Sequence, residues 1–215
     1  MRAGLLAVLL ASVPAVPGFA ETASESPVGL YDGHQMEIGA HLELSADGRY
    51  RYELSYGALD EWSAGTWVRD GESIVLTSDP FTPPAFDIRE DGKRTGSLAI
   101  RMDLPDGFDA QYFWLKLVHA DGSSTFESMT RDGLDIPMGD NPVVSLQPIL
   151  PVMDLMGPTF AVPSAGAALR IAFKPNDLGV AGFDHERLPR NGDAYELARH
   201  GRTIRFRKVD TKDEL

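Results

Sequence analysis

Histidine and carboxylate side chains carry most of the chemistry available to this sequence, which contains no cysteine. His34, Glu37 and His41 bring three metal-ligating side chains close together along the chain. Their spacing differs from the His-Glu-x-x-His pattern with which zinc enzymes place two ligands on one helical face. On a strand, residues of equal parity share a face, so we expect Glu37 and His41 to point together and His34 to point away. With nearby carboxylates, His34 or His41 would make this a metal-binding protein; an ordinary polar rim is the alternative.

Two adjacent carboxylates, Asp60 and Glu61, follow Tyr56 in a segment that we expect to be a loop at the mouth of a barrel. Paired acids there would accept hydrogen bonds from a polar or cationic ligand. If burial separated their pKa values, they would also serve as general acid and base, which gives the hypothesis of a hydrolase. No feature of the sequence indicates such burial, and solvated acids at a tight corner near Gly57 are the simpler interpretation.

Three further clusters have structural as well as chemical interpretations. Four methionines in the second half of the chain could bind Cu(I), because thioethers are ligands that this ion prefers. They are irregularly spaced, however, and methionine commonly fills apolar cores. These residues are Met129, Met138, Met153 and Met156. Five basic residues near the C-terminus would either bind a phosphate or carboxylate ligand or lie on an outward strand face, paired with acidic neighbours. They are Arg199, Arg202, Arg205, Arg207 and Lys208. Asp184-His185-Glu186 has no assembled constellation around it. We therefore predict no catalytic residue, no cofactor and a noncatalytic protein.

The elements that must position these side chains are β-hairpins. Seven Asp-Gly dipeptides punctuate the chain, most of them between short runs of alternating apolar and polar residues. Asp-Gly suits the two central positions of a type I′ turn, since both need positive φ. The clearest hairpin pairs residues 42–44 with residues 50–54 across Asp47-Gly48. No run of ten or more residues has a convincing helical pattern, so the sequence predicts an all-β fold.

Prolines and the chain ends suggest two units. Residues 28–78 give about five antiparallel strands, and the prolines in Asp79–Pro84 then interrupt any ladder. We expect the hairpin within residues 192–209 to return and close a barrel with residues 28–80, because a five-strand meander would otherwise leave two open edges. Residues 84–190 would form a β-sandwich-like unit. Within it, the proline-rich apolar segment 142–163 is either extended on the sheet or a lid over a cavity.

Residues 28–78 resemble small lipocalin-like barrels of uncharacterised bacterial exported envelope proteins. The likeness lies in Gly29-Leu30-Tyr31, Leu42 to Tyr50, Gly65-Thr66-Trp67 and Tyr56 to Glu61. These are motifs of hairpins and core aromatics, so the resemblance implies an antiparallel barrel and no particular activity. Barrels of this broader type bind lipids, haem or metals, or serve as accessory domains. No binding motif of those relatives is matched.

The chain ends and the charge bear on location. Residues 1–20 have the basic start, apolar stretch and small-residue cleavage site of a signal peptide, so we expect a periplasmic or secreted bacterial protein. The last four residues, Lys212 to Leu215, match an endoplasmic-reticulum retrieval signal, which gives the lumen of a eukaryote as the alternative. A formal net charge of −12 disfavours nucleic acid and anionic lipid. No later segment is long and apolar enough to span a bilayer.

These observations together predict a noncatalytic exported binding module. Its partner would be a small apolar or amphipathic ligand, or another protein of the cell envelope. Segment 142–163 is a candidate wall of the binding cavity, and the candidate ligand-binding residues are Tyr31, Tyr50, Tyr52, Tyr56, Trp67, Asp60 and Glu61.

Overall fold

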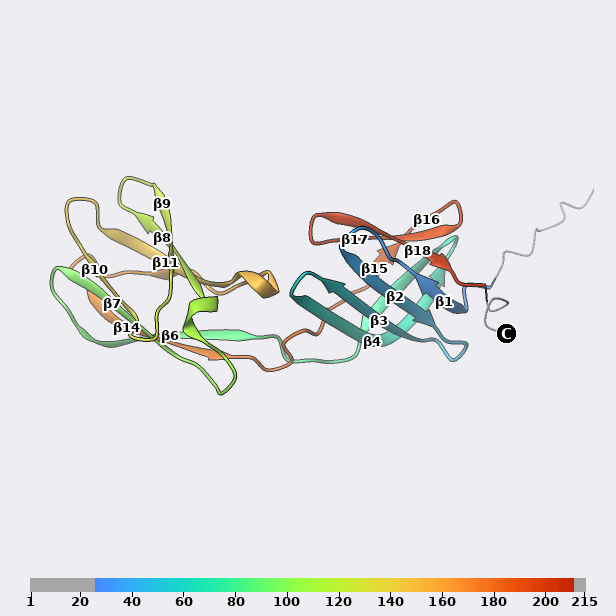
Figure 1. Cartoon of the computed structure of the whole chain (residues 1–215), viewed down its shortest axis with the longest axis horizontal. Coiled ribbons are helices and arrows are strands. Elements are labelled where there is room, and N and C mark those ends of the chain that lie inside the picture. The colour runs from blue at the N-terminus through green and yellow to red at the C-terminus, as the bar shows by residue number, and fades with distance from the viewer. Residues whose placement is uncertain (1–25, 211–215) are drawn as a thin grey trace, which may run out of the picture.

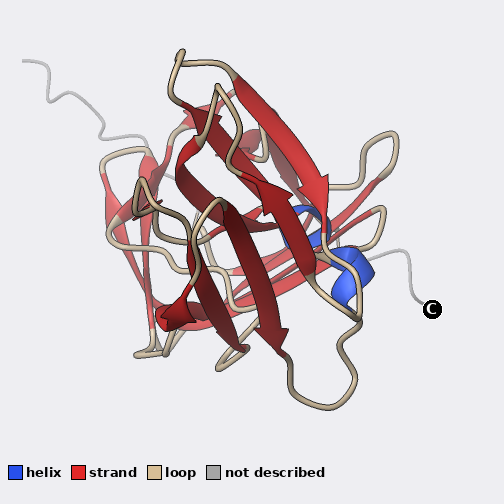
Figure 2. Cartoon of the chain, turned by 90° about the vertical axis from the view of Figure 1, so that its left-hand side faces the viewer, coloured by secondary structure: helices blue, strands red, loops and turns tan. Residues whose placement is uncertain are grey.

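The chain folds into two β units joined by two linkers (Figure 1). The computed structural model describes residues 26–210, so the expected signal peptide and the Lys212–Leu215 motif lie outside the described residues. The fold is all-β, as predicted, and helical structure in the described part is limited to the single turns η1 (Ala110–Tyr112) and η2 (Pro151–Met153) (Figure 2). None of the helices in that part could cross a membrane.

The first unit is a nine-stranded antiparallel sheet that curls into a nearly closed barrel. Its spatial order is β15-β5-β4-β3-β2-β1-β18-β17-β16. Only Pro189 separates the two edge strands along the chain, and its carbonyl accepts a hydrogen bond from the Glu196 backbone N–H. The strands are β1 (Gly29–Asp32), β2 (Ile38–Leu44), β3 (Arg49–Tyr56), β4 (Leu59–Asp70), β5 (Ser73–Ser78), β15 (Glu186–Leu188), β16 (Arg190–Asn191), β17 (Ala194–Arg199) and β18 (Arg202–Lys208).

The C-terminal hairpin returns to the start of the chain. β18 pairs with β1, with Tyr31 opposite Lys208, and this pairing removes the open edge of β1. The barrel has nine strands rather than the seven expected from residues 28–80 and 192–209. The difference lies in β15 and β16, so the predicted end of the sandwich unit at residue 190 is too late.

The second unit is a β-sandwich. One sheet has the order β10-β7-β14-β6, in which β14 runs parallel to β7, and the other has the order β12-β11-β8-β9 with β13 on β11. Side chains of both sheets form one apolar core, which includes Leu98, Leu115, Leu146 and Ile171. The strands are β6 (Ala85–Lys93), β7 (Ser97–Asp103), β8 (Trp114–His119), β9 (Ser124–Ser128), β10 (Leu134–Pro137), β11 (Val143–Leu150), β12 (Leu155–Met156), β13 (Phe160–Ala161) and β14 (Ala167–Lys174).

Segment 142–163 belongs to this sandwich. Its first half is β11, which pairs with β8 and alternates buried and outward-facing residues, so it is a sheet strand and not a lid. Its second half holds η2, which lies between the two units (Figure 1) and contacts β4 of the barrel. Met153 in this turn packs against the apolar cores of both units.

Two linkers cross between the units. The first, residues 79–84, is the predicted proline break, and the second follows β14. They are tied together because the Thr82 backbone N–H donates to Asp177 Oδ2 and the Asp177 backbone N–H donates to the Thr82 carbonyl. The second linker then runs beside β4, where the Trp62 N–H donates to the Gly179 carbonyl, and it inserts Phe183 into the barrel core.

The turns differ from the type I′ geometry predicted for Asp-Gly. Among the described residues, no aspartate of the seven dipeptides has positive φ; in the β2–β3 turn only Gly48 does, with φ +82°. Type I′ geometry occurs instead at His200-Gly201, where φ is +49° and +70° and Arg199 pairs with Arg202 across the turn. Histidine is among the residues that tolerate the left-handed region.

Candidate functional site

Glu61 is a buried carboxylate at one end of the barrel. The segment 55–61, predicted to be a loop, is a two-residue turn at Gly57-Ala58 flanked by β3 and β4, so Asp60 and Glu61 are strand residues. Because successive strand residues point to opposite faces, Asp60 faces solvent and bonds Ser55 Oγ, whereas Glu61 points inward and is 7 % exposed. The two carboxylates therefore do not form the acid–base pair that the hydrolase hypothesis requires.

Four hydrogen bonds satisfy the Glu61 carboxylate. Arg199 donates through Nε to Oε1 at 2.9 Å and through Nη2 to Oε2 at 2.6 Å, which is the bidentate fork geometry of a strong ion pair. Tyr52 donates its hydroxyl to Oε1 at 3.3 Å, and His200 Nε2 lies 2.7 Å from the same oxygen. The Arg199 guanidinium also stacks over the Phe183 ring, 5.5 Å from its centroid.

This environment changes the pKa values of the cluster. Burial alone would raise the pKa of Glu61, but the hydrogen bonds and charge of Arg199, with a smaller contribution from His200, outweigh it and lower that pKa. The same hydrogen bonds raise the pKa of Arg199. Burial, reinforced by the Glu61 charge, raises the pKa of Tyr52, which is therefore a neutral hydrogen-bond donor. At neutral pH the cluster holds an ionised carboxylate beneath a guanidinium.

His200 connects this cluster to the sandwich. Its Nδ1 lies 3.2 Å from Asp154 Oδ2, and Asp154 follows η2 with φ +49° in the left-handed region. Both ring nitrogens thus face carboxylate oxygens, one from each unit, and only the imidazolium form donates to both at once. Two non-glycine residues in the left-handed region meet here, a concentration of unusual backbone that is typical of functional sites.

Two adjoining pockets open beside this cluster, and we call them together the interunit cleft. The first has a volume of about 360 Å³ and the second about 550 Å³. They share Leu59, Asp154 and His200. The first is also lined by Glu61, Pro84, Met153, Leu155, Leu178, Gly179, Val180, Ala198 and Arg199. The second is also lined by Tyr56, Ala58, Pro151 and Val152.

The predicted ligand-binding residues separate into cleft and core. Tyr56, Glu61 and part of segment 142–163 line the cleft. Tyr50 and Tyr52 are 1 % exposed and pack on Phe183, so their rings fill the barrel interior as core residues and line neither cleft pocket. Tyr31 packs on Tyr195 and lines a separate pocket near Lys208. Trp67 packs on the core and donates its Nε1–H to the Ser45 carbonyl.

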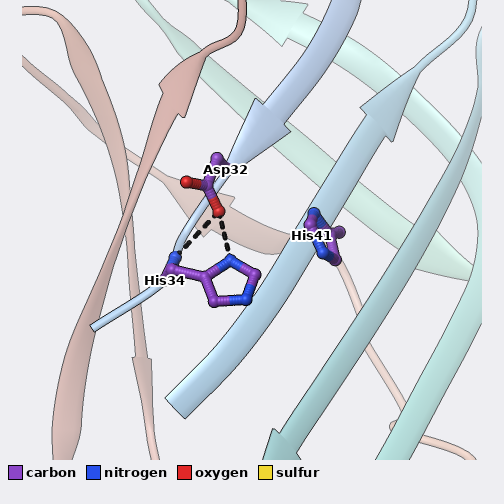
Figure 3. Close-up of side chains that lie close together, drawn as sticks. All are labelled: Asp32, His34 and His41. Atoms are coloured by element: carbon purple, nitrogen blue, oxygen red, sulfur yellow. Dashed lines mark hydrogen bonds and ion pairs between the residues drawn. The ribbon is translucent and has the colours of Figure 1, made fainter. Parts of the chain in front are cut away.

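The histidines near the N-terminus assemble differently from the strand-parity prediction. His34 and His41 lie side by side, with ring centroids 4.9 Å apart, and Asp32 joins them (Figure 3). Glu37 turns away, takes φ +66° and lies 3.6 Å from Arg202. The prediction from strand parity is wrong because the residues do not lie on one strand. His34 follows β1, His41 lies on β2, and a tight turn separates them. The hydrogen bonds from His34 lower the pKa of Asp32.

The other predicted clusters have structural roles. Met129, Met138 and Met153 belong to the apolar core of the sandwich and Met156 is exposed, which agrees with methionine as a core filler. Three of the C-terminal basic residues pair with acids, Arg202 with Glu37, Arg205 with Glu196 and Arg207 with Asp193, and Lys208 donates to the Ser26 carbonyl. Arg199 alone of that stretch reaches the cleft. The outward strand face paired with acids, one of the two predicted interpretations, is the one observed.

Glu61 was predicted from the sequence as a ligand-binding residue, but the residues that contact its carboxylate were not predicted as its partners. Arg199 and His200 stand 138 and 139 residues away along the chain, and Asp154 comes from the other unit. The available signal was the turn Arg199-His200-Gly201-Arg202, whose central pair suits a type I′ turn. No family model, no curated protein and no solved structure matches this chain. Inference about function therefore rests on the cleft.

Proposed function

We propose that this protein is a noncatalytic binding module that holds a small amphipathic ligand in the interunit cleft. The observation that carries the proposal is the Glu61–Arg199–His200–Asp154 cluster at the junction of two pockets whose walls combine polar and apolar surface. Ligand sites are typically concave and apolar, with a few converging polar groups that orient the ligand. They also occur preferentially at boundaries between domains.

The walls of the cleft suit the apolar part of such a ligand. Leu59 comes from the barrel, Met153 and Leu155 from the sandwich, and Leu178 and Val180 from the second linker. These side chains are only partly buried, apart from Leu59, so covering them would remove apolar surface from water. That gain is about 25 cal/mol per Å² of apolar area.

The polar side chains of the cleft are better suited to hydrogen bonding with a ligand than to acid–base catalysis. Glu61 already accepts four bonds, which leaves it no role as a free base, and both nitrogens of His200 are engaged. Asp154 is the accessible acceptor, with 72 % of its side chain exposed. Arg199, one quarter exposed, adds donors that Glu61 does not use. An amphipathic ligand would place its polar group here.

The proposal includes location and fold type. We propose that the chain is exported, on the basis of residues 1–20, and that its barrel is lipocalin-like, on the basis of the motifs in residues 28–78. The mouths of β-barrels are among the places where ligand sites occur. The barrel interior itself is occupied by aromatic core residues such as Tyr52 and Phe206, so the ligand would sit outside it.

Fluorescence titration with anilinonaphthalene sulfonate (ANS), an amphipathic dye, tests the proposal. Ala198 is exposed and lines the first pocket, so Ala198→Trp would fill that pocket without disturbing the core. We expect this variant to bind ANS at least about tenfold more weakly than the unmodified protein, a difference of about 1.4 kcal/mol.

The matched control is Ala120→Trp, which places the same side chain at an exposed alanine in the β8–β9 loop, a residue that lines neither cleft pocket. It should bind ANS like the unmodified protein. Absence of saturable ANS binding by the unmodified protein, or an equal loss in both tryptophan variants, would contradict the proposal.

A further inference from the structure

The outer face of the barrel carries a second group of side chains, Asp32, His34 and His41, which lines neither cleft pocket. Asp32 ends β1 and stands directly opposite His41 on β2 in the strand register. His34 follows two residues after Asp32, in the turn that joins the two strands, and its ring lies against Asp32 with His41 beside it on the neighbouring strand (Figure 3). All three are exposed.

The ligating atoms of these side chains converge. One carboxylate oxygen of Asp32 and one ring nitrogen from each histidine all lie within 4.8 Å of one another. Asp32 Oδ1 is 2.5 Å from His34 Nδ1. Two imidazole nitrogens and a carboxylate oxygen are the donor set that Zn²⁺ accepts, with bonds of about 2.0–2.2 Å. Small rotations of exposed side chains would bring all three atoms to that distance from one ion.

The backbone beneath the group is held in place. The Gly33 N–H donates to the Ala40 carbonyl, and residues Gln35 and Ile38 exchange two backbone hydrogen bonds across the turn. The Gln35 side chain also donates to the Thr203 carbonyl on β18. Three ligands are therefore presented by two paired strands and a tight turn, and little backbone ordering remains to oppose binding.

Gly39 lies next to the His34 ring. Gly39 is on the same face of β2 as His41, two residues earlier. A Cβ at this position would lie 3.4 Å from His34 Nε2, in contact with the ring. A branched side chain would add methyl groups on this side of the ring, so we expect a valine at position 39 to push the His34 ring away from His41.

We propose that Asp32, His34 and His41 form a binding site for one divalent transition-metal ion, with Zn²⁺ as the ion of choice. The ion would replace the hydrogen bond between Asp32 and His34, and its remaining coordination positions would face solvent and carry water. Three protein ligands with an open position are the arrangement of an accessible zinc site rather than a closed structural one. Glu53, opposite His41 on β3, adds negative charge beside it.

Isothermal titration of the full-length, tag-free protein with zinc chloride tests this site. We expect one Zn²⁺ per chain, and affinity reduced at least about tenfold in His34→Ala, His41→Ala and Asp32→Asn. Gly39→Val, which keeps all three ligands, should weaken binding through the displaced His34 ring. Circular dichroism would confirm that each variant is folded.

His185→Ala is the matched control. His185 is exposed and lies 2.8 Å from Asp184, so it offers a His–Asp pair without the third ligand found at His41. It should bind Zn²⁺ like the unmodified protein. The proposal is overturned if the unmodified protein takes up no stoichiometric Zn²⁺, or if His185→Ala loses as much affinity as His41→Ala.

Discussion

At the scale of single residues, Glu61 is the side chain on which the cleft depends. Removing a carboxylate from water is costly unless charge and hydrogen bonds replace hydration, and here Arg199, His200 and Tyr52 do so. In return, Glu61 fixes the direction of Arg199 and His200, which are the groups that face the cleft. The carboxylate thus holds the polar side chains that line the cleft.

Replacing Glu61 by glutamine should destabilise the barrel. Glu61→Gln leaves the Arg199 guanidinium partly buried beside a neutral amide, and we expect a loss of about 2–4 kcal/mol in the free energy of unfolding. Urea denaturation followed by tryptophan fluorescence measures it, in a Trp114→Phe background so that Trp62 and Trp67 of β4 report the barrel alone. Asp60→Asn, an exposed neighbour, should change stability by less than about 0.5 kcal/mol. Equal effects at both positions would contradict the account.

The lowered pKa of Glu61 predicts a pH dependence of a definite sign. A carboxyl whose pKa is lower in the folded state stabilises the fold above its unfolded pKa, and that stability is lost as pH falls through the folded pKa. The barrel should therefore become less stable below about pH 4, the ordinary range of glutamate. Asp32 and Asp79 contribute in the same direction, so the relevant quantity is the difference between the unmodified protein and Glu61→Gln. The difference in free energy of unfolding between the two proteins should become smaller between pH 6 and pH 3, because Glu61 takes up about one proton in this range. A difference that stays constant with pH would contradict the assigned role of the Glu61 carboxylate.

At the scale of elements, alternation and turn chemistry predicted the strands better than the turns. Leu42, Tyr50 and Tyr52 alternate with polar residues, and they are buried on β2 and β3 as expected. The loop expected at 55–61 is absent because Gly57 takes φ +61° and needs only Ala58 to complete the turn. A short polar and small-residue run cannot distinguish a loop from a turn with two strand ends.

The candidate site could be predicted only in parts. Glu61, the Arg199–Arg202 turn and segment 142–163 were each recognisable from residue type, but nothing local indicates that they meet. Their meeting depends on the return of β17 and β18 to the barrel and on the position of η2 between the units, which are long-range features. The sequence predicted His34 and His41 on opposite faces of one strand, because the turn at Gln35–Ile38 could not be recognised from sequence.

Gly65 gives a prediction for the β4–β5 pairing. A Cβ at this position would lie 2.0 Å from the Thr77 carbonyl oxygen and 2.8 Å from the Ser78 Cα, both backbone atoms that cannot move alone. Gly65→Ala should therefore destabilise the barrel by about 3 kcal/mol. Gly139→Ala, where a Cβ meets no atom within 4 Å, should be neutral within about 0.5 kcal/mol. Thermal or urea unfolding compares them, and a tolerated Gly65→Ala would show that β4 and β5 pair differently.

At the scale of the whole molecule, both units line one cleft. Two linkers, the contact of η2 with β4, and the His200–Asp154 hydrogen bond all join them at the same end of the barrel. A cleft built from both units couples their stabilities, because a ligand that contacts both stabilises both.

Ligand binding should therefore stabilise both units together. At a concentration one hundred times its dissociation constant, ANS should add about 2.7 kcal/mol to the free energy of unfolding. Trp114→Phe reports the barrel, and Trp62→Phe/Trp67→Phe leaves Trp114 to report the sandwich. The unfolding midpoints of both reporters should rise. A rise confined to one unit would place the ligand on that unit alone.

The most direct test of the central claim is an amide NMR titration of the full-length protein with ANS. We expect the largest shift changes on Leu59 and Glu61, on residues 152–155 and 178–180, and on residues 198–200, which together surround the cleft. These changes should saturate with one dissociation constant and disappear in Ala198→Trp. Shift changes confined to other surfaces, or unaffected by Ala198→Trp, would contradict a binding site between the two units.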